Sequence, residues 1–186
     1  MNNTENHAST TSNPKPAEND SDKRRHLSIY LNDHLAGSTT IVNLLGDLLR
    51  TGPGDNDVGE FLTALRSDIT ADRATLAGIM QMLQIDKHRR RTATAWLGEK
   101  LGRRKFRLDD SENASLHLLE ALELVEVGIE GKRELWRSLA ATADQLKPLK
   151  GINFDHLIQR AEEQHDRVET VRVRIAKTAL TMAQVA

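Results

Sequence analysis

The amino-acid sequence predicts an all-α protein built as a four-helix bundle. Four long segments repeat apolar residues at alternating spacings of three and four, which is the pattern of helices that pack along one face. Two of the connections between them are short and contain Gly and Pro. Only 3% of the 186 residues are aromatic while 38% are hydrophobic, so the core must be mainly Leu, Ile, Val and Ala, a composition that favours helices over a β-sandwich.

The chain opens with a segment that has no apolar periodicity and is rich in Asn, Thr, Ser, Pro and Glu. Such a segment cannot bury enough apolar surface to offset ordering, so we predict a disordered tail over residues 1–21 and a helical domain over 22–186. The absence of cysteine excludes disulfides and thiolate sites. With no secretory signal and no apolar stretch of roughly 20 residues, a cytoplasmic protein is expected.

The first predicted helix begins after Ser21 or Asp22, either of which can act as its N-cap. It ends before the Gly- and Pro-containing break at residues 51–57. Its inward stripe is Leu27, Leu31, His34, Ser38, Ile41, Leu45 and Leu48. Gly37 and Gly46 lower the helix propensity, so each is expected to mark the close approach of another helix.

Three further segments show the same spacing. The second helix covers residues 58–85, the third and longest 111–146, and the fourth 154–179 after a turn at Gly151 and Asn153. The second stripe is Val58, Leu62, Leu65, Ile69, Asp72, Leu76, Ile79 and Leu83. The third is Leu118, Leu122, Val125, Ile129, Lys132, Trp136, Leu139, Ala143 and Leu146, and the fourth is Phe154, Ile158, Ala161, His165, Val168, Arg172, Ile175 and Ala179.

The connection between the second and third helices is long, at residues 86–110, and contains a short amphipathic helix at 92–103. It can cross the length of the bundle, which would leave the second and third helices parallel. This is the connectivity of ferritin-like bundles. An up-down-up-down bundle, with the connection folded back as a cap, is the alternative.

Polar residues interrupt the stripes at matching distances from the turns. His34 and Asp72 are equally far from the first turn, so they should face each other across the first hairpin. Lys132 and His165 should lie within one helical turn of each other across the second. Since a buried charge without a partner is costly, we expect a satisfied network that fixes helix register. The alternatives are a ligand or metal site, or a stripe assignment that is off by one residue, so that some of these side chains face water.

Further charged residues can complete this network. Arg172 should lie level with Glu126, and Lys132 or Arg172 is expected to pair with Glu123 or Glu126.

One helix also resembles the ferritin-like di-iron proteins. These carry a Glu on each of two helices and a Glu-x-x-His on each of the other two. Glu162-x-x-His165 matches that spacing, but the second helix has no such pair. The sequence therefore predicts no cofactor, and the resemblance implies a di-iron or other divalent metal as the alternative. The candidate ligands would be His34, Asp72, Glu123, Glu126, Glu162 and His165.

Two strings resemble an uncharacterised family of bacterial ferritin-like helical-bundle proteins. They are Tyr30-Leu-Asn-Asp-His-Leu-Ala-Gly37 and Glu130-Gly-Lys-Arg-Glu-Leu-Trp136. The resemblance implies the fold of the four helices, but no established activity and no catalytic residues.

The long connection is strongly basic, although the whole chain has a formal net charge of −1. Residues 87–107 hold nine Lys or Arg and one acid. Such a segment can bind an anionic partner, either nucleic acid or another anionic surface, or it can lie against the acidic helices. The candidate residues are Arg89, Arg90, Arg91, Arg103, Arg104 and Lys105.

No complete catalytic motif is present in the sequence: there is no phosphate-binding Gly-rich loop, no nucleophile elbow and no His-Glu-x-x-His. The sequence therefore predicts a non-catalytic interaction or structural module that self-associates as a homo-oligomer. A metal- or ligand-binding bundle, and a binder of an anionic partner through residues 87–107, are the alternatives.

Overall fold

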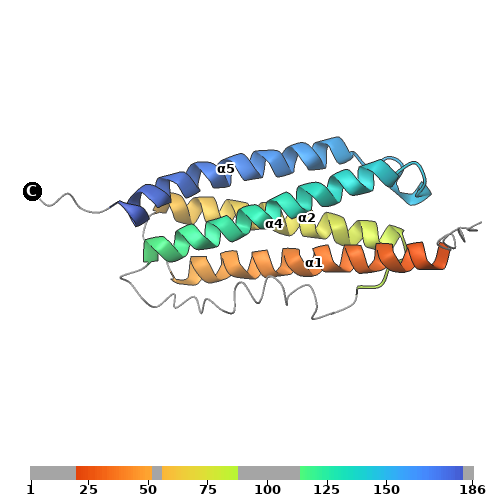
Figure 1. Ribbon diagram of the computed structural model, residues 1–186, viewed down its shortest axis with the longest axis horizontal. Helices are drawn as coiled ribbons and strands as arrows, with labels where there is room; N and C mark the ends of the chain where they lie inside the picture. The colour runs from red at the N-terminus through yellow and green to blue at the C-terminus, as the bar shows by residue number, and fades with distance from the viewer. Residues whose placement is uncertain (1–19, 52–55, 88–113, 182–186) are drawn as a thin grey trace, which may run out of the picture.

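The computed structural model describes residues 20–51, 56–87 and 114–181 (Figure 1). In these ranges the chain forms four long helices and one short 3₁₀ turn. They are α1 (Asp20–Thr51), α2 (Asn56–Met82), α4 (Ala114–Thr142), η2 (Lys147–Leu149) and α5 (Phe154–Leu180). The predicted all-α, four-helix architecture is confirmed. Of the tail predicted over residues 1–21, residues 1–19 lie outside the described residues, and Asp20 and Ser21 already belong to α1. The short helix expected at 92–103 also lies outside the described residues.

The helices form two antiparallel hairpins, α1 with α2 and α4 with α5, and α1 also packs against α4. In Figure 1, α2 and α4 both run from left to right, whereas α1 and α5 run from right to left. The end of α2 and the start of α4 therefore lie at opposite ends of the bundle. This is the direction that a crossover connection gives, and an up-down-up-down order would have reversed α4.

The turn between α4 and α5 follows from its residues. Gly151 has a φ of +95°, which glycine adopts without a Cβ penalty. The Asn153 side chain accepts a hydrogen bond from the backbone N–H of His156 at 3.0 Å and caps α5, so the predicted turn is confirmed. The third helix ends at Thr142, earlier than the expected residue 146. The Thr142 hydroxyl bonds back to the carbonyls of Ser138 and Leu139, and a short turn leads to Pro148.

The core consists of two hydrophobic clusters stacked along the bundle. One contains Ile41, Leu45, Leu62, Ile69, Leu122 and Ile129 among others. The other contains Leu31, Leu76, Ile79, Leu135, Trp136 and Phe154 among others. Along α2 and α4 the boundary between them falls at Asp72 and Lys132. The polar interruptions on these two helices therefore lie at a common depth. No described helix has the length and apolar character needed to cross a membrane.

Candidate functional site

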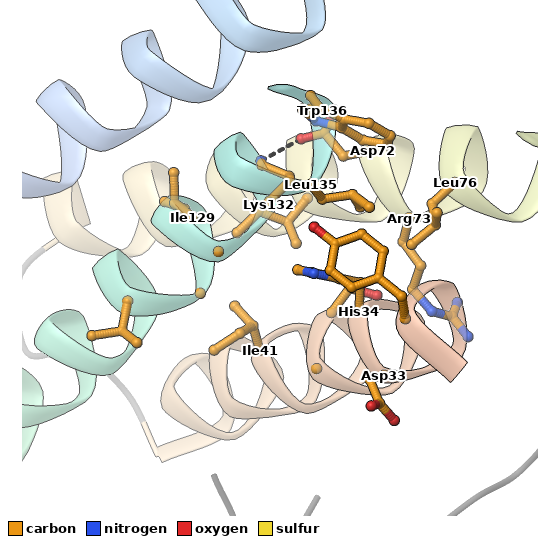
Figure 2. Close-up of a pocket in the computed structure, with 17 residues that line it drawn as sticks. Asp33, His34, Ile41, Asp72, Arg73, Leu76, Ile129, Lys132, Leu135 and Trp136 are labelled. Atoms are coloured by element: carbon orange, nitrogen blue, oxygen red, sulfur yellow. Dashed lines mark hydrogen bonds and ion pairs between the residues drawn. The ribbon is translucent and has the colours of Figure 1, made fainter. Parts of the chain in front are cut away.

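A buried carboxylate lies at the boundary between the two clusters. Asp72 on α2 is only 3% exposed, and its Oδ2 accepts a hydrogen bond from Lys132 Nζ of α4 at 2.6 Å. The same oxygen accepts from Gln164 Nε2 of α5 at 3.0 Å, and Lys132 Nζ also donates to Gln164 Oε1. Arg160, also on α5, is 3.2 Å from Asp72 Oδ1. One carboxylate thus holds three helices in register. Figure 2 shows its contact with Lys132.

The ammonium group of this network is held in a poorly hydrated place. The Lys132 side chain is 12% exposed. Burial lowers the pKa of Lys132 below its usual value, and the Asp72 carboxylate opposes that shift. The expected network exists, but Asp72 pairs with Lys132 and not with His34, and Lys132 pairs across helices and not with Glu123 or Glu126.

His34 of α1 lines the same pocket as Asp72 and Lys132. Its imidazole ring packs edge-on against the Tyr30 ring, with centroids 4.6 Å apart and planes at 74°. Burial lowers the pKa of His34, and the nearby Asp33 carboxylate only partly opposes this. The imidazole is therefore neutral near pH 7.

We expect the His34→Gln variant to lose less stability in acid than the wild type. Because the folded-state pKa of His34 is below the ordinary value of 6.5, the unfolded chain takes up this proton first as the pH falls. Stability is therefore lost as the pH drops from about 6.5 toward the folded-state pKa, and the contribution is intact above that window. Urea-unfolding midpoints between about pH 7 and pH 5 would measure this. Equal losses in both proteins would contradict the expectation.

A pocket of about 530 Å³ opens between α1, α2 and α4 beside the Asp72–Lys132 pair (Figure 2). From α1 it is lined by Tyr30, Asp33, His34, Gly37, Ser38 and Ile41, from α2 by Ile69, Asp72, Arg73 and Leu76, and from α4 by Val127, Gly128, Ile129, Gly131, Lys132, Leu135 and Trp136. In Figure 2, Ile41 projects from α1 toward α4. The lining therefore combines apolar side chains of all three helices with a few polar and charged groups.

Glycines shape this pocket in two ways. A Cβ on Gly37 or Gly131 would meet no atom within 4 Å, so these positions leave the space open. The predicted close helix approach at Gly37 is wrong. The close approach is instead at Gly128, where a Cβ would lie 2.7 Å from Cγ1 of Ile41. A Cβ on Gly46 would lie 3.4 Å from Nε of the Arg66 side chain, which is an ordinary van der Waals contact.

A second charged cluster lies between α4 and α5. Arg172 Nε is 3.3 Å from Glu126 and 2.6 Å from Glu169. The prediction that Arg172 lies level with Glu126 along the bundle is therefore confirmed. Burial is the main cause that raises the pKa of Glu126, and Glu169 adds to it. Glu123 of α4, which was also proposed as a metal ligand, is exposed.

The Glu162-x-x-His165 pair does not face the bundle interior together. Glu162 lies 3.7 Å from Arg133 and 3.4 Å from Arg137, and the His165 side chain is 42% exposed. The inward-facing residue is Gln164, which is fully buried, so the expected position of His165 in the stripe is wrong by one residue.

The six proposed metal ligands are thus distributed over three places: the pocket, the Arg172 cluster and the surface. In the described ranges no three His, Asp or Glu side chains come close enough together to hold a metal ion. The proposed anion-binding residues Arg89, Arg90, Arg91, Arg103, Arg104 and Lys105 lie outside the described residues, so that role stays a prediction.

No protein-family model, curated protein or solved structure matches this chain. The family resemblance carried by residues 30–37 and 130–136 therefore stays a prediction. These two strings nevertheless lie on facing helices, and residues of both line the same pocket.

Proposed function

We propose that this protein is a non-catalytic helical bundle that binds a small molecule in the pocket between α1, α2 and α4. The observation that carries this is the pocket itself. Its volume of about 530 Å³ is within the range of small-molecule sites, roughly 300 to 1,000 Å³. Its mixture of apolar walls and a few polar groups is also typical of such sites.

The charges around the pocket support a binding role over a catalytic one. Asp72 accepts from Lys132 and Gln164 and has Arg160 beside it, so its oxygens are already engaged. A general base must reach the proton that it removes, and a carboxylate held by three partners is poorly suited to that task. The network is better suited to holding the walls of the pocket in place.

The parallel course of α2 and α4 supports ferritin-like connectivity as the finer description of the fold. Self-association as a homo-oligomer stays part of the proposal. Val127 is a large apolar residue that is 45% exposed beside the pocket, and a second copy could cover it.

Filling the pocket should abolish ligand binding without loss of fold. We expect Gly131→Leu to place its side chain in open space and to prevent binding. Gly78→Leu is the matched control, because Gly78 is also helical, also has nothing within 4 Å and does not line the pocket. Both changes remove a helical glycine, which raises the intrinsic helix propensity.

The measurement is ligand-observed NMR with three naphthalene probes of similar shape: naphthalene-2-methanol, 2-naphthoate and 2-naphthylmethylammonium. Binding of any of them to the wild type and to Gly78→Leu, but not to Gly131→Leu, is the expected result. Lack of binding by all three, or equal binding to both variants, would rule the proposal out.

A further inference from the structure

The apolar part of the pocket is contributed by all three helices. Ile41, Ile69, Leu76, Ile129 and Leu135 line it, and each is less than 5% exposed. Gly37 and Gly131 add bare backbone where a side chain would otherwise fill the space. Burial of apolar surface against these walls is therefore the main source of affinity available to a ligand.

The charged residues that line the pocket are balanced, with two acids and two bases. Asp72 and Lys132 are paired with each other. Arg73 Nε donates to Thr39 Oγ1 at 3.0 Å. Asp33 is exposed, and Figure 2 shows its carboxylate directed away from the labelled side chains of α4.

A charged ligand would therefore lose hydration on entry, and the Asp72 and Lys132 charges that it would meet are already paired with each other. A neutral ligand incurs no such cost. The charge pattern of the lining thus selects against both anions and cations.

His34 is a polar group of the pocket with hydrogen-bonding capacity to spare. Trp136, which also lines the pocket, has a buried Nε1–H without a partner among the described residues. Among the described residues, none forms a hydrogen bond with either of its ring nitrogens, although the Tyr30 ring holds the imidazole edge-on. Figure 2 shows His34 projecting from α1 toward α4, over the pocket. A neutral imidazole offers one donor and one acceptor nitrogen, so it can pair with a hydroxyl or a carbonyl.

We propose that the ligand is an uncharged, mainly apolar small molecule whose single hydroxyl or carbonyl group hydrogen-bonds to His34. This proposal rests on the proposed function of the pocket and specifies its ligand class. The apolar body lies against Ile41, Ile129 and Leu135, and the polar group lies at the His34 side.

Isothermal titration calorimetry on the full chain near pH 7.5 tests the ligand class. Naphthalene-2-methanol is expected to bind at least about tenfold more tightly than 2-naphthoate or 2-naphthylmethylammonium, since each charged probe must be desolvated. It should also bind roughly 3- to 10-fold more tightly than 2-methylnaphthalene, which has the same shape without the hydroxyl.

The role of His34 is tested with His34→Leu. The variant should still bind both neutral probes, but the preference for the alcohol over 2-methylnaphthalene should disappear. A preference that is unchanged in His34→Leu would overturn the assignment of His34.

The outcomes separate this inference from the proposed function. Pocket-dependent binding in which the anion or the cation is favoured would overturn the uncharged ligand class and leave the pocket as a binding site. If no probe shows binding that Gly131→Leu abolishes, both the proposed function and this ligand class are overturned.

Discussion

Asp72→Asn should destabilise the protein by roughly 3 to 5 kcal/mol, because removing one member of a buried ion pair leaves the other charge without compensation. Asp72 is 3% exposed and Lys132 is 12% exposed, so water cannot readily replace the lost carboxylate. The amide is close in size to the carboxylate, and the effect therefore reports charge and hydrogen bonding more than volume. Urea unfolding followed by circular dichroism measures it, with an unchanged slope m showing that the comparison is valid.

A matched control lies one helical turn away on the same helix. Asp68 pairs with Arg167, but their side chains are 35% and 46% exposed. Since exposed ion pairs contribute about 0 to 1 kcal/mol, Asp68→Asn should cost no more than that. Similar losses in the two variants would show that Lys132 reaches water after all and that Asp72 does not organise the interior.

The high-pH behaviour of Asp72→Asn provides a second check on the same cause. The Asp72 carboxylate raises the pKa of Lys132, against the larger effect of burial. In the absence of this carboxylate, the Lys132 ammonium loses its proton more readily in the folded state, because burying a neutral amine costs less free energy than burying a charged one. The unfolded state then binds more protons than the folded state, so the penalty should shrink as the pH rises toward the ordinary value of 10.5.

The helical stripes were predictable because burial follows a simple period. Every member of the predicted α2 stripe is buried, including the polar Asp72. The stripe of α4 is buried from Leu118 to Leu139 apart from Lys132, whose side chain is 12% exposed. In these two helices apolar residues flank each polar interruption closely, and only one register of the helix buries them all.

The register of α5 was less predictable because its middle is polar on all sides. Between the buried Ala161 and Val168, seven residues apart, both Gln164 and His165 satisfy the helical spacing. A spacing of three then four selects Gln164, and four then three selects His165. The choice depends on whether the side chain can reach Asp72 across the bundle, and this is a property of the assembled helices.

The pocket itself could not be predicted from the sequence either. A glycine in a helix shows only that a side chain is absent, and it does not show whether a neighbouring helix fills the space. Gly37 and Gly131 face open space, while Gly128 faces a side chain of α1. These outcomes depend on how the axes of α1 and α4 diverge, and therefore on all the side chains packed between them.

Gly128→Ala should be less stable than Gly131→Ala by roughly 1 to 3 kcal/mol, the usual cost of overpacking. The new methyl group would lie 2.7 Å from Cγ1 and 2.9 Å from Cδ1 of Ile41. Ile41 is β-branched, 3% exposed and packed in the core, so it cannot easily rotate away. Both substitutions remove a glycine from the same helix, so their gain in helix propensity cancels in the comparison and the difference reports the overlap.

A double-mutant cycle with Ile41→Ala assigns this cost to the α1–α4 contact. In the Ile41→Ala background the overlapping atoms are gone, so Gly128→Ala should no longer destabilise the protein and should gain stability as Gly131→Ala does. Thermal and urea unfolding of the four proteins give the coupling energy. If Gly128→Ala costs the same with and without the Ile41 side chain, the two helices do not meet at this point.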